Sequence, residues 1–391
     1  MNNVQKYAFF HKLQKKDDAI FIIQYFFATF ADQIRLNALS RMEIQKVIIS
    51  HQLETALAEA TSACKADRTF VLLDETTKDM CWPIVRDYGC MAGAETIVIP
   101  AGDLHKELDS VIHVWNELQR MGATRHSLLI NLGGGMVTDL GGFAASTFKR
   151  GIHLVNIPTT LLSMIDASVG GKTGFNFGGL KNEIGVFRNA SSVILDTVFL
   201  KTMDRENMLS GYAEMLKHGL INHDGMLAEL LTFDIENADL KELQCMVAES
   251  VEVKQRIVTE DPTEQGIRKA LNLGHTVGHA FESLALQRQP VLHGYAVAWG
   301  LVCELYLSVI KTGFPTDKMR QTVHFIFDHY GRMPITCDDY PTLLELMTHD
   351  KKNTAGIINF TLLGGVGDIR INQTATAEEI KEALDFYRDG N

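Results

Sequence analysis

The sequence is short of positive charge and has no closely spaced cysteines. Its 391 residues include 37 lysines and arginines against 48 aspartates and glutamates, so the formal net charge is -11. Because a phosphate backbone or an anionic membrane attracts a basic surface, we expect no nucleic-acid partner and no membrane partner. The six cysteines, at positions 64, 81, 90, 245, 303 and 337, form no CxxC pair. This pattern predicts reduced thiols in a cytoplasmic protein and excludes a disulfide framework and a cysteine metal site.

An apolar run near the N-terminus, from Ala19 to Ala31, is too short to span a bilayer comfortably. Lysines precede this run as in a signal peptide, but Asp17 and Asp18 interrupt the basic flank. We therefore interpret residues 1–41 as an extension, either an amphipathic helix or sequence that precedes the domain. The stretch MEIQKVIIS, which starts at Met42, is expected to open the first domain with a strand.

The rest of the chain has the composition and length of a globular protein with two domains: 46% of its residues are hydrophobic and 22% are charged. Up to about Thr202, β-rich apolar runs alternate with helical patterns, which is typical of a parallel α/β sheet. The expected strands are 68–75, 95–102, 127–135 and 153–160. After residue 203 the pattern changes to long helical periods with few strand signals. We predict an α/β domain over 42–202 and a mostly α-helical domain over 203–391.

Polar residues and glycines follow the expected strands, where open sheets of this kind bind ligands. The stretch INLGGGMVTDLGGFAAS predicts a strand, a glycine turn at Gly133 to Gly135 and a helix, an arrangement that lets a backbone approach a pyrophosphate. Its spacing is GGGxxxD and not GxGxxG, so a nucleotide site and a simple tight turn both remain open. Asp74 is placed to accept hydrogen bonds from a ribose. Asp103 and Lys106 are either similar contacts or an ordinary helix start.

Cations gather in the glycine-rich stretch FKRGIHLVNIPTTLLSMIDASVGGKTGFNFGGLKNEIG. It contains Arg150, Asp166, Lys172, Lys181 and Asn182, and glycine-rich loops lie at protein surfaces and rarely form a core. Several cations within an acidic chain predict a small anionic substrate such as a phosphate or a carboxylate. The alternative for each single lysine is an ordinary solvated side chain.

Two histidines in LNLGHTVGHAFES lie four residues apart, which on a helix places His275 and His279 on one face. From spacing alone, both bind one metal, one does, or neither does. Glu214 lies in an otherwise apolar stretch and must be paired or bound to a metal if it is buried. One glutamate and two histidines form a zinc set with an open coordination position, and His293 supplies a further candidate. The helical half also carries the polar candidates Lys217, Lys254, Arg268 and Asn272.

Linked motifs give the sequence a resemblance to the 3-dehydroquinate synthase family. They are GGGMVTDLGGF, RGIHLVNIPTTLL, DASVGGKTGFN, LKNEIG, GYAEMLKHGLI, LNLGHTVGHAFE and LHG, in the family's order and spacing, and the resemblance covers about Val47 to Gly364. It implies a Rossmann-like NAD domain followed by a helical metal and substrate domain. It also implies NAD, one divalent metal (zinc or cobalt), a sugar phosphate substrate and a homodimer. The family converts 3-deoxy-D-arabino-heptulosonate 7-phosphate to 3-dehydroquinate and phosphate in the shikimate route to aromatic amino acids.

The resemblance also assigns site residues. It implies Glu214, His275 and His293 as metal ligands and turns His279 toward the substrate phosphate or a bridging water, so the HxxxH pair is no longer the expected ligand pair. The implied substrate-binding and catalytic residues are Arg150, Asp166, Lys172, Asn182, Lys217, Lys254, Arg268, Asn272, His279 and Lys352, the last favoured over Lys351. The implied NAD contacts are Asp74, Asp103, Lys106, Gly133, Gly134, Gly135, Met136, Asp139, Thr159, Thr160, Leu162, Asp166, Lys172, Lys181, Phe199 and Thr202.

Three positions depart from the family pattern, and other functions remain to be weighed. Asp103 and Thr76 stand where glutamate and asparagine are frequent, and Tyr295 follows the LHG motif where many relatives have glutamate, which concerns the groups around the metal ligands. One rival function is a related cyclase that acts on sedoheptulose 7-phosphate. A second is a metal-dependent polyol dehydrogenase, which needs no anion-binding set. A third, a non-catalytic homologue, is expected to lack a metal ligand or Lys172, and neither is missing.

Overall fold

The computed structural model describes residues 45–348 and 358–390. The extension over residues 1–41 and the alternative between Lys351 and Lys352 lie outside these ranges, so both interpretations stay predictions. The strand expected after Met42 is present as β1 (Lys46–Ile49).

A six-stranded parallel sheet forms the first half of the described chain, as the sequence predicts. Its strand order is β1-β8-β5-β4-β2-β3. The expected strands appear as β2 (Thr69–Asp74), β3 (Glu95–Ile99), β4 (Leu128–Gly133) and β5 (His153–Pro158), and β8 (Ser192–Leu195) joins them. Every residue of β4 is buried, which is characteristic of a strand in a parallel sheet covered on both faces.

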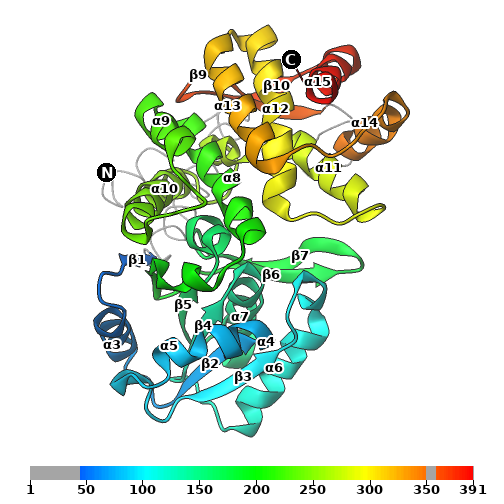
Figure 1. Cartoon of the computed structure of the whole chain (residues 1–391). Coiled ribbons are helices and arrows are strands. Elements are labelled where there is room, and N and C mark those ends of the chain that lie inside the picture. Colours follow the sequence, from blue (N-terminus) through cyan, green and yellow to red (C-terminus); the bar gives the residue numbers. More distant parts are fainter. Residues whose placement is uncertain (1–44, 349–357, 391) are drawn as a thin grey trace, which may run out of the picture. The chain divides into compact units, whose positions relative to one another are not determined.

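Helices connect these strands by crossovers and cover the sheet (Figure 1). They are α3 (Leu53–Cys64), α4 (Glu75–Met80), α5 (Trp82–Val85), α6 (Leu108–Arg120) and α7 (Gly135–Thr147). The right-handed rule for such crossovers places α3 and α4 on one face of the sheet and α6 and α7 on the other. Short 3-10 turns link them: η1 (Gly89–Met91), η2 (Asp103–His105) and η3 (Phe148–Arg150). The predicted strand, glycine turn and helix at Gly133 to Gly135 are therefore confirmed.

The cation-bearing glycine stretch is only partly a loop. Residues 172–187 form an antiparallel hairpin of β6 (Lys172–Phe177) and β7 (Leu180–Phe187). Gly178 and Gly179 both have positive φ, 60° and 78°, which the tight turn between two antiparallel strands requires. We expected Lys172, Lys181 and Asn182 in glycine-rich loops, but they lie on paired strands, because this turn lets the residues on either side of it pair.

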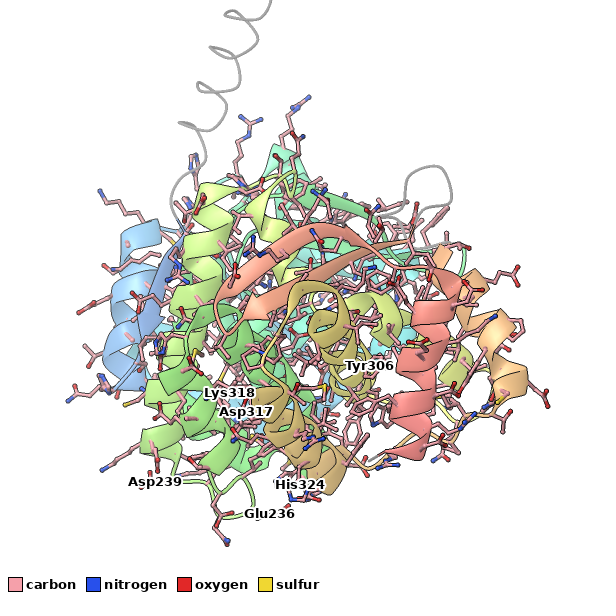
Figure 2. All side chains as sticks on the ribbon, turned by 90° about the horizontal axis from the view of Figure 1, so that it is seen from above. Glu236, Asp239, Tyr306, Asp317, Lys318 and His324 are labelled. Atoms are coloured by element: carbon pink, nitrogen blue, oxygen red, sulfur yellow. The ribbon has the colours of Figure 1, made fainter. Side chains whose placement is uncertain are left out.

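The second half is mostly helical, as predicted. Its helices are α8 (Arg205–Asn222), α9 (Asp224–Thr232), α10 (Leu240–Glu260), α11 (His275–Leu286), α12 (His293–Thr312), α13 (Thr316–Tyr330), α14 (Tyr340–Thr348) and α15 (Ala377–Asp389). Its short 3-10 helices are η6 (Ile267–Asn272) and η7 (Cys337–Asp339), while the π-helix η4 (Ser163–Ala167) and the 3-10 helix η5 (Thr197–Thr202) precede this half in the chain. The sequence did not predict the antiparallel hairpin of β9 (Asn359–Gly365) and β10 (Asp368–Thr374). The exposed side chains of Glu236, Asp239 and His324 lie at the periphery of this half (Figure 2).

Helix α12 lies in the core of the helical half. Within the described ranges, it alone is long and apolar enough to cross a membrane by length and composition, but most of it is buried. It packs against α8, α11, α13, α15 and β9. A Cβ atom added to Gly300 on α12 would collide with the carbonyl oxygen of Gly274, just before α11, and would come within 2.9 Å of the Cα of Gly278. The backbones of α11 and α12 are therefore in direct contact.

Candidate active site

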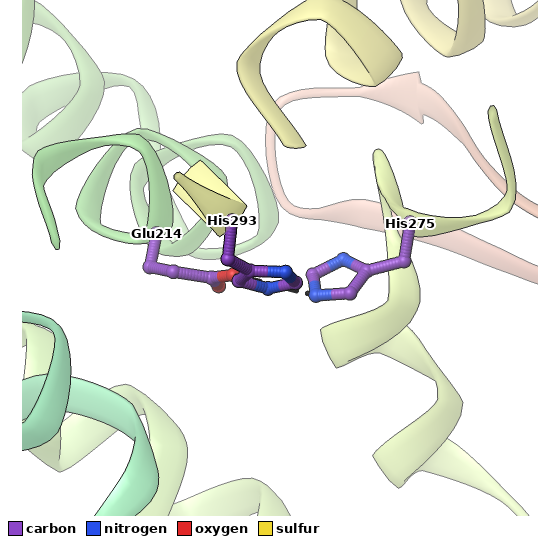
Figure 3. Close-up of side chains that lie close together, drawn as sticks. All are labelled: Glu214, His275 and His293. Atoms are coloured by element: carbon purple, nitrogen blue, oxygen red, sulfur yellow. Dashed lines mark ion pairs between the residues drawn. The ribbon is translucent and has the colours of Figure 1, made fainter. Parts of the chain in front are cut away.

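Three side chains from three helices meet at one point (Figure 3). Glu214 comes from α8, His275 is the first residue of α11 and His293 is the first residue of α12. Glu214 Oε1 lies 3.3 Å from Nε2 of His275 and 3.4 Å from Nε2 of His293. Glu214 is fully buried, and among the described residues this oxygen has no hydrogen-bond partner. A buried carboxylate oxygen faced by two imidazole nitrogens fits a divalent metal of the zinc type.

The outer nitrogens of the two imidazoles have acceptors of their own. His275 Nδ1 lies 3.1 Å from the carbonyl oxygen of Leu273, and His293 Nδ1 lies 3.4 Å from Glu282 Oε2. Proteins orient metal-binding histidines in this way, because a proton held on Nδ1 leaves the lone pair of Nε2 for the metal. Both Nε2 atoms are therefore the ones that point inward.

The charges around the site attract a cation. Burial would raise the pKa of Glu214, but the ammonium of Lys217, which donates to Glu214 Oε2, and His275 hold that pKa well below its usual range. Burial also works against a charged His293, yet the adjacent carboxylates of Glu214 and Glu282 raise the pKa of His293 to about 10. The pair of carboxylates on either side of His293 thus favours a proton or a metal ion at this position.

His279 lies next to these three residues, but its ring nitrogens are close to a different set of potential ligand atoms. Its ring centroid is 5.3 Å from that of His275 and 6.1 Å from that of His293. The ligand atoms of Glu214, His275 and His293 all lie within 4.8 Å of one another, whereas His279 shares such a group with Glu282 and His293. The geometry therefore favours the set that the resemblance implies over the pair that the HxxxH spacing suggests.

The start of α11 is fixed by a buried carboxylate from α12. Glu304 is fully buried; its Oε2 accepts a hydrogen bond from the backbone N–H of Gly274 at 2.6 Å, and its Oε1 accepts from those of Thr276 and Val277 at 2.9 and 3.1 Å. A negative charge is favourable at a helix N-terminus, where these N–H groups have no partner within the helix. Glu304 therefore holds the turn that begins with His275.

Several of the predicted anion-binding residues meet at the loop between α10 and η6. The ammonium of Lys172 lies 2.5 Å from Glu264 Oε2, and Asn272 Nδ2 donates to Glu264 Oε1 at 3.0 Å. Arg268 donates to the carbonyl oxygens of Pro262 and Gly170 at 2.6 and 3.5 Å. Burial would raise the pKa of Glu264, but Lys172 and Asn272 hold it below its usual range. Sequence reasoning missed Glu264; its only signal was an acid four residues before Arg268.

A further lysine, Lys254, is buried beside the carboxylate of Asp166. Lys254 on α10 forms an ion pair with Asp166 Oδ1 at 2.5 Å, and Asp166 lies in the η4 turn. Burial would raise the pKa of Asp166, but Lys254 holds it well below its usual range. Asp166 and Glu214 form a close group with His218, a buried histidine that the sequence did not single out. Burial lowers the pKa of His218 to about 3, so this imidazole is neutral.

Arg150 lies apart from these residues. It is exposed, has a positive φ of 68° and stands in η3, at the amino end of β5. The other strand-end candidates follow the carboxyl end of β5, and the six residues of this strand span about 20 Å. Within one chain, the structure therefore does not bring Arg150 to the expected anion-binding set.

The glycine turn at the carboxyl end of β4 leaves room for close approach to its backbone. An added Cβ would lie 2.6 Å from Val137 at Gly133, 3.1 Å from Thr160 at Gly134 and 3.2 Å from Ala167 at Gly135. Nearby, the buried ammonium of Lys106 contacts Asp139 at 2.5 Å and Asn182 at 2.7 Å. Burial raises the pKa of Asp139 despite this lysine. The turn, Lys106 and Asp139 lie where the sequence predicts nucleotide contacts.

The other expected nucleotide contacts have structural partners as well. Asp74 Oδ1 accepts from the N–H of Thr77 at 2.7 Å and so caps α4. Lys181 lies 3.5 Å from Asp103 and 2.8 Å from Glu282. Thr159 and Phe199 are buried, and Thr202 donates to the carbonyl oxygen of Phe199 at 2.7 Å. The half-buried expected contacts are Met136, Thr160 and Leu162.

Two family models match the chain: the 3-dehydroquinate synthase N-terminal model over residues 96–210 and the C-terminal model over residues 211–353. A 3-dehydroquinate synthase of Parabacteroides distasonis is 55% identical over 349 residues, which cover 89% of this chain and 99% of that protein. A 3-dehydroquinate synthase of Pyrococcus furiosus is 39% identical over 327 residues, which cover 83% of this chain and 94% of the relative.

Solved structures of sugar-phosphate cyclases share the fold. The 2-epi-5-epi-valiolone synthase of Streptomyces hygroscopicus, with NAD+ and Zn2+ bound, has a TM-score of 0.77 at 24% identity and covers 90% of this chain and 98% of its own. A 2-deoxy-scyllo-inosose synthase complexed with carbaglucose-6-phosphate, NAD+ and Co2+ has a TM-score of 0.75 at 23% identity and covers 88% of this chain and 96% of its own.

Proposed function

The chain belongs to the 3-dehydroquinate synthase family, and we propose that it converts 3-deoxy-D-arabino-heptulosonate 7-phosphate to 3-dehydroquinate and phosphate. We propose NAD and one divalent metal, Zn2+ or Co2+, as its cofactors. The observation that carries this proposal is the buried carboxylate oxygen of Glu214, which faces two imidazole nitrogens. The near-complete coverage of a 55% identical relative of that name supports the choice of substrate.

Glu214, His275 and His293 would hold the metal, which when bound supplies Lewis-acid polarisation of a substrate oxygen. The residues fit this group, because three ligands leave a coordination position open for the substrate. The ammonium of Lys217 contacts the second oxygen of Glu214, so the carboxylate stays ionised while it is fully buried.

The glycine turn after β4 would hold the pyrophosphate of NAD. When bound, NAD supplies hydride transfer from and back to the substrate. The bare backbone of Gly134 and the first N–H groups of α7 are suited to phosphate oxygens. Asp74 would accept from a ribose, as acids at strand ends do in related sheets. We propose 42–202 as the nucleotide-binding domain and 203–391 as the metal- and substrate-binding domain.

Lys172, Arg268 and Asn272 would hold the substrate anions. Each charge-assisted hydrogen bond of this kind contributes about 1.5–3 kcal/mol. Glu264 contacts Lys172 and Asn272 and holds both side chains toward one point. His279, whose ring adjoins those of His275 and His293, would move a proton at the substrate.

Phosphate release tests this function. The full chain, loaded with Zn2+ or Co2+ and NAD, is expected to release phosphate from the heptulosonate phosphate and to form 3-dehydroquinate. Omission of NAD or of the metal should stop the reaction, and Glu214→Gln should stop it in the complete mixture. No phosphate release with all components present would contradict the proposal.

Sedoheptulose 7-phosphate in the same assay separates the rival cyclase function. Turnover of that substrate alone would favour the rival. Oxidation of a simple polyol with net accumulation of NADH would favour a dehydrogenase, since the proposed reaction produces no net NADH.

We further propose a cytoplasmic homodimer. All six cysteines lie in the described ranges as free thiols, which supports a reducing compartment. The β6–β7 hairpin exposes the large apolar side chains of Phe177, Leu180 and Phe187, between 51% and 57% accessible, which supports contact with a second copy. A second copy would also explain the position of Arg150, because that residue could then reach the partner's site.

A further inference from the structure

Glu282 lies on the same helix and the same face as two of the histidines. His275, His279 and Glu282 stand at positions i, i+4 and i+7 of α11, so their side chains project to one side of the helix. The side chain of Glu282 is 11% exposed. A carboxylate that is this far buried needs partners for its charge.

One oxygen of Glu282 faces a proposed metal ligand. Glu282 Oε2 lies 3.4 Å from Nδ1 of His293, while Nε2 of the same ring lies 3.4 Å from Glu214 Oε1. The imidazole therefore lies between two carboxylates, one on each nitrogen. A hydrogen bond from Nδ1 to Glu282 fixes the orientation of the ring and leaves the Nε2 lone pair directed at Glu214 and the metal position.

The other oxygen of Glu282 pairs with a lysine from a distant part of the chain. Glu282 Oε1 accepts from the ammonium of Lys181 at 2.8 Å, and Lys181 lies on β7 of the hairpin. The side chain of Lys181 is half-exposed. Each oxygen of the buried carboxylate thus has one partner, a histidine on α12 or a lysine on β7.

Tyr295 is not the residue that orients the imidazole of His293. It follows the LHG motif at the position where the sequence departs from the family pattern, but its ring packs against Trp299 and Tyr330, with centroids 6.1 and 5.3 Å away. The carboxylate that contacts His293 comes from α11 instead.

We propose that Glu282 is a positioning residue that orients His293 for the metal and links this ligand to Lys181 of the β6–β7 hairpin. The proposal rests on the metal site of the proposed function. Loss of such an outer carboxylate typically costs 10- to 100-fold in metal affinity.

The test measures Zn2+ affinity and not turnover. The Zn2+ dissociation constant of the full chain is measured by competition with a chromogenic chelator, for the natural sequence and for Glu282→Gln. We expect Glu282→Gln to raise the dissociation constant about 10- to 100-fold with an unchanged far-UV spectrum. The visible spectrum of bound Co2+ should also change, because His293 is no longer held in one orientation. Glu117→Gln, which removes a half-buried carboxylate on α6 that is paired with Arg120, is the matched control and should leave both readouts unchanged.

Lys181→Met keeps the proposal testable if Glu282→Gln does not fold, because Lys181 is half-exposed. This variant leaves Glu282 on His293, so Zn2+ affinity should stay the same or rise as a nearby positive charge is removed. A dissociation constant unchanged by Glu282→Gln, or raised about 10-fold or more by Lys181→Met, would overturn the proposal. Normal Zn2+ binding without phosphate release would instead contradict only the proposed function.

Discussion

Glu304 accepts a hydrogen bond from the backbone nitrogen of Gly274 at 2.6 Å, immediately before the first residue of α11, His275. The same helix that carries Glu304 begins with His293. A single element, α12, therefore supplies one proposed metal ligand directly and fixes the backbone position of another.

Glu304→Gln should destabilise the protein and weaken metal binding together. An amide has only one acceptor oxygen, and its NH2 group would face backbone N–H donors in a fully buried site. We expect the free energy of unfolding to fall by about 1–3 kcal/mol, measured by urea denaturation. Glu382→Gln, an exposed change on α15, is the control and should change the unfolding free energy little. An equally stable Glu304→Gln variant would contradict a capping role.

His275→Ala and His279→Ala should differ in metal content. Without His275, one carboxylate and one imidazole remain, too few for a three-ligand site, so purified His275→Ala should contain little metal. His279→Ala should keep close to one metal per chain, bind NAD normally and lose turnover by about 10²–10⁴-fold. Metal analysis of both purified variants checks this. Equal loss of metal from both would restore the HxxxH pair as the ligand pair.

Asp74→Ala should weaken NAD binding by roughly ten- to a hundredfold, since a charged hydrogen bond of about 1.5–3 kcal/mol is lost. Metal content should not change. Because Asp74 also caps α4 through Thr77, the control is Thr77→Ala, which breaks the other half of the same capping box. If both variants weaken NAD binding equally in titration calorimetry, the effect of Asp74 is on the helix and not on the ribose.

Arg150→Ala and Glu214→Gln should complement each other when mixed. Each variant alone should be inactive. If Arg150 serves the site of a second copy, random mixing should restore about one quarter of the natural activity, because half of the dimers are mixed and each has one intact site. Phosphate release after mixing, unfolding and joint refolding checks this. No recovery in a mixture that forms dimers would place Arg150 in its own chain's site or in none.

The sequence predicted the first half of the fold better than the hairpins. β2, β3, β4 and β5 are apolar runs that end at glycines or polar residues, so local pattern was sufficient for them. The β6–β7 hairpin is mostly exposed and rich in glycine, and it lacks the apolar alternation that identifies a strand. β9 and β10 pair around a turn that contains Gly367, a local feature that helical periods on both sides obscured.

The candidate site, like the fold, could be predicted from the sequence only in part. Spacing alone paired His275 with His279, because sequence distance cannot reveal that α12 brings His293 to the same point. The resemblance implied Glu214, His275 and His293, which is one of the three groups of potential metal ligands among the described residues. Glu264, Glu282 and Glu304 were not singled out, because each is distinguished only by partners far along the chain. Glu282, for example, contacts Lys181, 101 positions away.

The way the hairpin meets the helical half makes its attachment sensitive to dissolved salt. Lys172 reaches Glu264 and Lys181 reaches Glu282, and both ammonium groups are about half-exposed, at 53% and 50%. Ion pairs at such positions contribute only about 0–1 kcal/mol and are screened by mobile ions. Helices α11 and α12 are in direct backbone contact at Gly278 and Gly300, and this contact does not depend on ion pairs. Higher ionic strength should therefore weaken the attachment of the β6–β7 hairpin, which carries Lys172 and Lys181. It should leave the contact between the helices that carry His275 and His293 unchanged.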